Sequence, residues 1–217
     1  MSSSTPHSSN PPATGERGRF VILDGVDGCG KSTQAKMLVE RLEREGRSAL
    51  HLREPGSSKL GEELREIFLS RRHNLSAKVE VLLVAAARRA MLDECVEPAL
   101  AAGRDVVCER FHSSTFAYQG VAGGQDLEQL DRLLIDWASD PMPDLIVLLD
   151  IEVSVASARR GEATDRMEDR GDEFQKLVAE GYRRYSKRAG VVMLNGDRDV
   201  DTVAEQIWSE VCAHANS

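Results

Sequence analysis

The stretch Phe20-Val-Ile-Leu-Asp24, followed directly by Gly25-Val-Asp-Gly-Cys-Gly-Lys31-Ser32, decides the fold class. The first run is short and apolar, which is typical of a strand buried in a parallel sheet. The second fits the pattern Gly-x-x-x-x-Gly-Lys-Ser/Thr in full. Apolar residues at helical spacing predict a helix from about Ser32 to Glu45, so the motif lies between a strand and a helix. We therefore predict a phosphate-binding loop (P-loop) for a nucleoside triphosphate.

The residue types in this loop suit a triphosphate and a metal ion. Glycines let backbone N–H groups turn inward around phosphate oxygens, where side chains would collide. Lys31 can reach the β- and γ-phosphates, and the Ser32 hydroxyl can ligate Mg²⁺. The alternative is a plain glycine turn with an exposed lysine, which does not require the full pattern. We predict ATP and Mg²⁺ as cofactors, bound by Gly25, Val26, Asp27, Gly28, Cys29, Gly30, Lys31, Ser32 and Thr33.

The rest of the chain alternates between strand and helix patterns. Four further apolar runs predict strands at 48–52, 105–109, 145–150 and 191–194. One further helix is predicted to begin near residue 59, and another to follow the fourth strand and end near 160. The other predicted helices cover 77–102, 114–121, 126–138, 172–188 and 200–213. Pro98 could kink the 77–102 helix. This alternation, together with the P-loop motif, predicts an α/β protein with the P-loop NTPase fold: a five-stranded parallel sheet with helices on both faces. Ligands of such sheets bind beyond the carboxyl ends of the strands.

Composition narrows the class of protein. The net charge of −8 argues against a general nucleic-acid binder, because such domains usually carry a basic excess. No apolar run approaches the roughly 20 residues that a membrane span needs, so we expect no membrane partner. Four scattered cysteines without a CxxC pair predict a reduced, cytoplasmic protein. Residues 1–18 are rich in Ser, Pro and Thr and predict a disordered tail, which leaves 19–217 as one domain.

Four short motifs follow one another along the chain: Asp24-Gly-Val-Asp27, Arg53-Glu-Pro-Gly56, Glu109-Arg110-Phe111 and Ser114-Thr-Phe-Ala-Tyr-Gln-Gly120. In this order, and with an arginine in the predicted 77–102 helix, the chain resembles the thymidylate kinase family from Arg19 to about His214. The resemblance implies a P-loop nucleoside-monophosphate kinase domain over 19–217, which phosphorylates dTMP to dTDP with ATP and Mg²⁺. It also implies a homodimer formed through packed helices. The apolar face of the 77–102 helix is a candidate surface, and packing in the core of the domain is the alternative for that face.

Two other functions remain open at this level. One is a related P-loop kinase for another nucleoside monophosphate or for a nucleoside. The other is a catalytically silent regulatory protein that binds a nucleotide, against which the intact Lys31 and Ser32 argue. A panel of monophosphate acceptors would separate these readings.

Two arginines follow neighbouring predicted strands. Arg53 and Arg110 come at the carboxyl ends of the strands at 48–52 and 105–109, where their side chains are expected to converge on one point. A guanidinium fork suits a phosphate group. The resemblance implies that both arginines hold the acceptor monophosphate, and ordinary surface ion pairs are the alternative.

The resemblance also implies residues around the base, sugar and metal. Arg88 corresponds to an arginine that hydrogen-bonds thymine, and Val84 stands where the family has an aromatic side chain stacked on the base. Phe111 or Phe116 could supply that apolar wall instead, or the register of the comparison could differ. Glu109 would hold Mg²⁺-bound water together with Ser32. The implied substrate-binding residues are Asp27, Arg53, Val84, Arg88, Glu109, Arg110, Thr115 and Tyr118.

The segment 159–170 mixes both charges and lacks apolar periodicity. A solvated loop is the ordinary interpretation of such a pattern. The resemblance instead implies a mobile lid, because nucleotide kinases carry one after the fourth strand. Thymidylate kinases have an arginine either in the P-loop or in the lid. Since Gly28 follows Asp27 here, the resemblance implies the bacterial style, in which lid arginines reach the transferred phosphoryl group. The predicted catalytic residues are Lys31, Arg110, Arg160 and Arg166.

Overall fold

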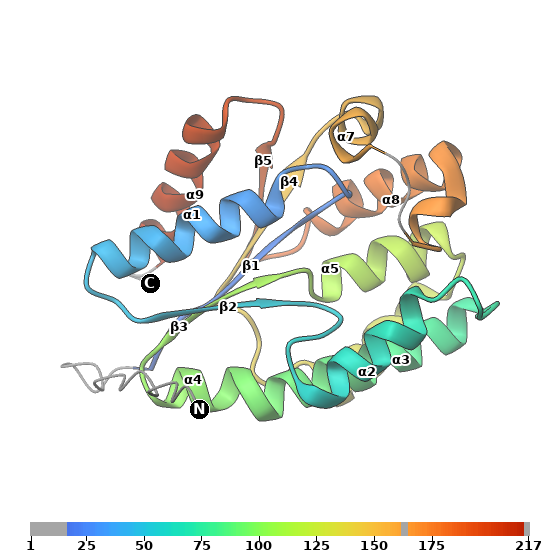
Figure 1. The fold of residues 1–217 in the computed structure, drawn as a ribbon, viewed down its shortest axis with the longest axis horizontal. Helices are drawn as coiled ribbons and strands as arrows, with labels where there is room; N and C mark the ends of the chain where they lie inside the picture. The colour runs from blue at the N-terminus through green and yellow to red at the C-terminus, as the bar shows by residue number, and fades with distance from the viewer. Residues whose placement is uncertain (1–16, 162–164, 215–217) are drawn as a thin grey trace, which may run out of the picture.

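A computed structural model describes residues 17–161 and 165–214 of the chain (Figure 1). Five parallel strands form one sheet in the order β2-β3-β1-β4-β5. The strands are β1 Phe20–Gly25, β2 Ala49–Arg53, β3 Asp105–Glu109, β4 Leu145–Asp150 and β5 Val191–Asn195. The predicted parallel sheet is confirmed, and the predicted bounds of β3 and β4 agree with the structure to the residue.

Strand β1 occupies the centre of the sheet. Its residues are all buried, and it pairs with β3 on one side and β4 on the other. Leu23 lies opposite Glu109 of β3, and Arg53 of β2 lies opposite the same glutamate. The carboxyl ends of β1, β2 and β3 therefore meet at one edge, where the P-loop leaves β1.

Helices cover both faces of the sheet, with α1 and α9 on one side and the α2–α4 layer on the other (Figure 1). Serine and aspartate caps set the start of several helices, because their side chains accept hydrogen bonds from first-turn N–H groups. Ser58 accepts from Gly61, Ser76 from Val79 and Asp126 from Gln129. The helices are α1 Lys31–Arg44, α2 Lys59–Leu69, α3 Ala77–Met91, α4 Glu97–Ala101, α5 His112–Thr115, α6 Leu127–Ala138, α7 Val153–Arg160, α8 Gly171–Tyr185 and α9 Val200–His214.

Two predicted helices are interrupted by π-helical segments. The helix expected over 77–102 is α3, a π segment at Leu92–Val96, and then α4. Pro98 lies in the first turn of α4, where a missing N–H costs little. A second π segment, Phe116–Ala122, follows α5 and replaces the α-helix expected over 114–121. Such segments are frequent at functional sites, and the second one carries Tyr118 to the site described below.

The amino-terminal boundary differs slightly from the predicted one. Residues 1–16 of the predicted tail lie outside the described part of the chain. Arg17 and Gly18, which the prediction assigned to the tail, are bound to the domain: the Arg17 guanidinium pairs with Asp144 at 2.9 Å, and Gly18 N donates to Leu100 O at 2.9 Å. Across the described ranges, no helix combines the length and the apolar character that crossing a bilayer requires.

Candidate active site

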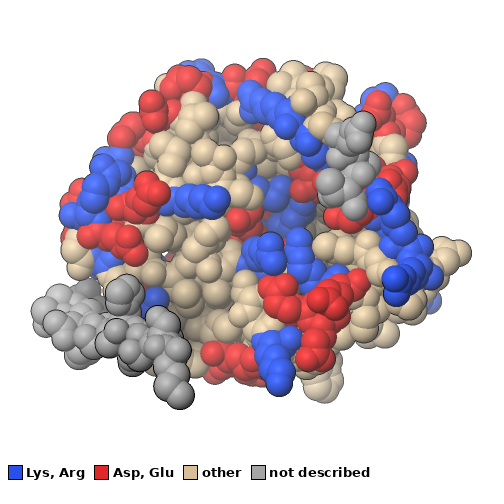
Figure 2. All heavy atoms as spheres, in the orientation of Figure 1, with Lys and Arg blue, Asp and Glu red and all other residues tan. Residues whose placement is uncertain are grey.

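A cleft of about 1180 Å³ opens at the carboxyl edge of the sheet. Figure 2 shows a hollow in this face, with atoms of lysine and arginine inside it. The P-loop, the ends of β2 and β3, and residues of α2, α3 and the predicted lid contribute to its walls. The cleft thus brings together segments that are far apart in the sequence.

The P-loop curls tightly at the floor of the cleft. Gly25, Gly28 and Gly30 have positive φ angles, which side-chain-bearing residues rarely adopt. A Cβ atom at Gly28 would lie 2.1 Å from the Ala156 carbonyl oxygen, so nothing larger than glycine fits there without movement of α7. The sequence pattern and the observed turn agree.

The Lys31 ammonium group turns back onto its own loop. Its Nζ lies 3.3 Å from Gly25 O, 3.2 Å from Val26 O and 3.1 Å from Asp27 Oδ1, and the residue is 7% exposed. These contacts hold a cation at the mouth of an anion-binding turn. A phosphate group entering the loop would meet both this charge and the N-terminus of α1.

Ser32, Glu109 and His51 form a connected group beside the P-loop. The Ser32 hydroxyl donates to Glu109, and His51 Nε2 lies 2.9 Å from Glu109 Oε1. Burial opposes ionisation of Glu109, but the hydrogen bonds from His51 and Ser32 outweigh it and lower its pKa. The group offers a carboxylate and a hydroxyl, the hard oxygen ligands that Mg²⁺ prefers. Sequence reasoning gave His51 no role, because an isolated histidine in a strand carries no motif.

Arg110 occupies a constrained position at the end of β3. Its φ of 69° is unusual for a side-chain-bearing residue and marks a backbone that the surroundings hold in place. The guanidinium pairs with Asp27, contacts Ser114 Oγ at 3.1 Å and lies 5.3 Å from the centre of the Tyr118 ring. Tyr118 donates to Asp27 at 3.1 Å. Burial opposes the charge of Asp27, but Arg110 and Lys31 hold its pKa well below the usual range.

A buried carboxylate organises the backbone around Arg110. Asp24 accepts hydrogen bonds from Ser113 Oγ at 2.6 Å, Ser114 Oγ at 2.9 Å and Tyr182 OH at 2.8 Å. It is fully buried and joins β1 to α5 and α8. Sequence reasoning placed Asp24 in a motif without assigning it this positioning role.

Three arginines face the cleft near the end of β2. Arg53 lies 3.4 Å from Glu62, has a side chain that is 55% exposed, and joins Arg110 and Arg65 in lining the cleft. Arg65 donates to Pro55 O at 2.8 Å. Burial, together with repulsion from Arg53 and Arg110, lowers the Arg65 pKa. This concentration of positive charge suits an anion, and sequence reasoning missed Arg65 because it stands inside an ordinary amphipathic helix.

Arg88 is fully buried in α3. Its Nε and one terminal nitrogen each donate to Glu54 at 2.7 Å, and that nitrogen also donates to Thr115 Oγ1 at 2.9 Å. The other terminal nitrogen, Nη1, is buried without a hydrogen-bond partner within 17–161 or 165–214. Glu54 and Thr115 line the cleft, whereas Arg88 is not among the residues that form its walls. Sequence reasoning did not identify Glu54 as the partner.

The apolar side chains on the cleft wall include residues of α2 and α3. Val84 lines the cleft as expected, but Phe111 and Phe116 are not among the residues that form its walls. Phe111 packs on Phe20 and Phe116 on Tyr185, with ring centres 5.5 and 5.3 Å apart. Phe68 of α2 lines the cleft instead.

The two predicted lid arginines occupy different surroundings. Arg160 lines the cleft, with its Nε 4.0 Å from Glu168. Arg166 does not line it: its Nε donates to Phe68 O at 2.5 Å and its Nη1 to Glu80 at 2.7 Å. Arg170 pairs with the same Glu80. Residues 162–164 of the predicted lid lie outside the described part of the chain.

Comparisons with known proteins agree with this geometry. The sequence model for "Thymidylate kinase" matches residues 23–207. A thymidylate kinase of Caldanaerobacter subterraneus subsp. tengcongensis is 39% identical over 199 residues, covering 90% of this chain and 95% of the relative. A thymidylate kinase of Ruegeria pomeroyi is 41% identical over 208 residues, covering 92% and 97%. A thymidylate kinase of Afipia carboxidovorans is 42% identical over 202 residues, covering 88% of each chain.

Proposed function

Because the chain belongs to the thymidylate kinase family, we propose that it transfers the γ-phosphoryl group of ATP to dTMP, giving dTDP and ADP. The observation that carries this proposal is a single cleft with two anion-binding regions. One is the P-loop with Lys31, and the other is the arginine group that contains Arg53 and Arg110. A phosphoryl donor and a phosphorylated acceptor can therefore face each other without a covalent enzyme intermediate.

The donor end would bind ATP and Mg²⁺. Lys31 would exchange its carbonyl and Asp27 contacts for the β- and γ-phosphates. Ser32 and Glu109 fit the metal, because Mg²⁺ in such sites takes only one or two protein oxygens and completes its shell with phosphates and water. Bound Mg²⁺ would neutralise charge on the phosphates. The described residues contain no group of three or more His, Cys, Asp or Glu side chains that could hold a metal ion by themselves.

The acceptor end would hold the monophosphate with Arg53 and Arg110, aided by Arg65. Arg160 of the lid lines the same cleft and would supply charge to the equatorial oxygens of the transferred group. The corresponding role predicted for Arg166 stays a prediction. It would require the Arg166 guanidinium to leave Glu80 and Phe68, which it contacts in this structure.

The nucleoside would lie along Asp27, Tyr118 and Thr115. The free Nη1 donor of Arg88 would bind a carbonyl oxygen of the base, which would satisfy a buried group that lacks a partner among the described residues. Asp27 would accept from the sugar 3′-hydroxyl, and the Tyr118 ring would crowd a 2′-hydroxyl and so favour deoxyribose. These roles follow the family resemblance. The role of Arg88 would require its Nη1 to become accessible from the cleft, because Arg88 is fully buried and is not among the lining residues of this structure.

The decisive experiment measures ADP release with a panel of acceptors. Purified protein with ATP and Mg²⁺ should turn over fastest with dTMP, and more slowly with dUMP, dCMP and dGMP. A higher kcat/KM for another monophosphate would reassign the acceptor. No turnover with any of them, despite measurable ATP binding, would support the silent regulatory alternative instead.

We further propose that the chain forms a homodimer through α3 and α6. These helices pack on each other through buried Val81 and Leu134, while Leu82 and Trp137 are 59% and 74% exposed. Large apolar side chains exposed on two adjoining helices are typical of a protein interface. Trp137→Glu should halve the mass measured by light scattering, whereas Leu177→Glu on α8 should not. The predicted cytoplasmic location and the absence of a nucleic-acid partner stay predictions.

A further inference from the structure

The base end of the cleft contains an aromatic ring that the sequence-based assignment of the site did not include. Among the described residues, Phe68 and Tyr118 are the phenyl-bearing side chains that line the cleft. Tyr118 is engaged by the residues proposed to meet the sugar and the phosphate, because its hydroxyl donates to Asp27 and its ring contacts Arg110. Phe68 is therefore the aromatic side chain of the cleft that can pack against a base.

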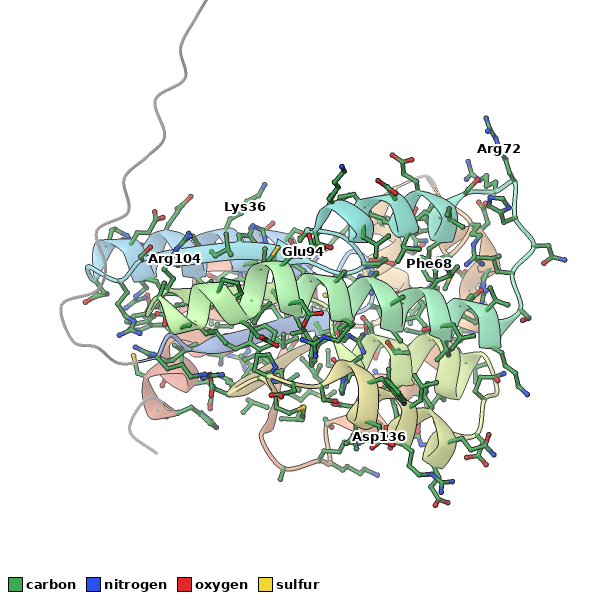
Figure 3. The ribbon with its side chains drawn as sticks, turned by 90° about the horizontal axis from the view of Figure 1, so that it is seen from below. Lys36, Phe68, Arg72, Glu94, Arg104 and Asp136 are labelled. Atoms are coloured by element: carbon green, nitrogen blue, oxygen red, sulfur yellow. The ribbon has the colours of Figure 1, made fainter. Side chains whose placement is uncertain are left out.

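Phe68 reaches the cleft from α2. Figure 3 shows it between α2 and α3, the helix that carries Val84. Phe68 and Val84 are each 6% exposed, belong to the same buried cluster and both line the cleft. Valine is smaller than an aromatic side chain, so a ring from α2 can occupy space that a larger residue at position 84 would fill.

Arg166, which is itself paired with Glu80, holds the Phe68 ring in place. The Arg166 guanidinium lies 5.0 Å from the ring centre, and its Nε donates to the Phe68 carbonyl oxygen at 2.5 Å. Buried Glu80 fixes the guanidinium in turn, at 2.7 Å. Phe68 lines the cleft and Arg166 does not, so Arg166 can hold the ring without occupying the cleft. The part of the ring that borders the cleft is available to a flat apolar ligand.

We propose that Phe68 is a specificity-determining residue that supplies the wall against which the acceptor base packs, and that Arg166 is its positioning residue. This inference rests on the proposed function, since it places the base of a nucleoside monophosphate between α2 and α3. It also gives the contact between Arg166 and the ring a reason: a cation held by Glu80 keeps the aromatic side chain in one orientation before substrate arrives.

The first test measures binding of three probes to Phe68→Leu and Phe68→Met. Loss of an aromatic–base contact should weaken dTMP binding about ten- to a hundredfold. Binding of ATP, and of 2-deoxyribose 5-phosphate, which lacks the base, should not change. Ile67→Ala provides the matched control, because Ile67 is the exposed neighbour of Phe68 on the same helix. A folded Phe68 variant with wild-type dTMP affinity would overturn the proposal, and so would equal losses for dTMP and the base-free probe.

The second test transfers the aromatic side chain from position 68 on α2 to position 84 on α3. The double variant Phe68→Leu/Val84→Phe should recover dTMP affinity relative to Phe68→Leu, because an aromatic wall is restored from α3. A double variant that binds dTMP no better than Phe68→Leu would count against a shared wall. This comparison also keeps the proposal testable if the single substitutions lower stability, since the total core volume is nearly conserved.

The third test separates the two roles for Arg166. As a positioning residue, Arg166→Gln should raise the KM for dTMP while kcat at saturating dTMP stays near the wild-type value. A lid residue that stabilises the transition state would instead lower kcat with KM unchanged, and that result would refute the positioning role. The wild-type acceptor panel distinguishes the two levels of inference. If wild type phosphorylates dTMP and these variants behave normally, the wall is wrong and the proposed function stands.

Discussion

The donor end and the base end of the cleft are built in different ways. At the proposed donor end one continuous stretch, Gly25–Ser32, supplies the backbone turn, the cation and the hydroxyl proposed to bind Mg²⁺. At the base end Glu54, Phe68, Arg88 and Thr115 come from separate elements and meet only after folding. The proposed donor site is thus encoded locally, whereas the proposed base site depends on tertiary packing.

The largest effect is expected from removing the charge at the donor end. Lys31→Ala deletes the cation of the P-loop and leaves the sheet untouched, so kcat should fall by at least ~100-fold, as for loss of one preorganised electrostatic contact. Circular dichroism should show an unchanged fold. Near-normal activity would remove Lys31 from the mechanism and weaken the distinction between the two ends.

The next largest effect is expected at Arg110 and Arg53, the arginines proposed to bind the acceptor phosphate. Arg110→Lys keeps the charge but loses the planar fork that binds a phosphate, so the KM for dTMP should rise by about ten- to a hundredfold. The KM for ATP should change less. Arg53→Lys should follow the same direction with a smaller increase, because the Arg53 side chain is more exposed. A kinetically silent Arg110→Lys, or a larger loss for ATP, would show that Arg110 serves the donor.

A smaller effect is expected in the lid. Arg160→Ala should lower kcat about tenfold, while ground-state ATP binding measured by calorimetry stays the same, because the contact strengthens as charge shifts in the transition state. Arg159→Ala is a suitable comparison, since the Arg159 guanidinium is engaged by Asp197 at 2.8 Å. Equal kcat for wild type and Arg160→Ala would identify the segment as a solvated charged loop.

The smallest kinetic effect is expected at Val84. Since Phe68 already borders this space, Val84→Phe alone should overpack the base end and lower the unfolding free energy by about 1–3 kcal/mol. The KM for dTMP should not improve. Thermal unfolding and steady-state kinetics on the same preparation would check both expectations. An improved KM with unchanged stability would mean that the site was vacant and that the base end lacks a wall.

The sequence predicted the elements that depend on local pattern. Strands at 105–109 and 145–150 follow from apolar runs, and the P-loop follows from its motif. The π segments at Leu92–Val96 and Phe116–Ala122 could not be predicted, because they reflect a change of hydrogen-bond partner inside an otherwise helical pattern.

Side-chain partners were harder to predict than elements. Arg88 was selected by its place in a motif, but its burial depends on Glu54, which a separate loop supplies. Phe68 was missed because one aromatic residue at helical spacing in α2 has the signature of ordinary core. Arg166 was selected by its position in a charged segment, and only the structure reveals that Glu80 holds it beside that ring.

The close approach of Gly28 to α7 restricts how this enzyme can evolve. Thymidylate kinases place an arginine either in the P-loop, after the residue that corresponds to Asp27, or in the lid. At position 28 a Cβ would meet the Ala156 carbonyl oxygen at 2.1 Å, in a backbone conformation with φ of 90° that favours glycine. Replacement of Gly28 by arginine would therefore require movement of α7. If the proposed lid arginine acts in transfer, exchanging one arrangement for the other would require coordinated changes in two segments of the chain.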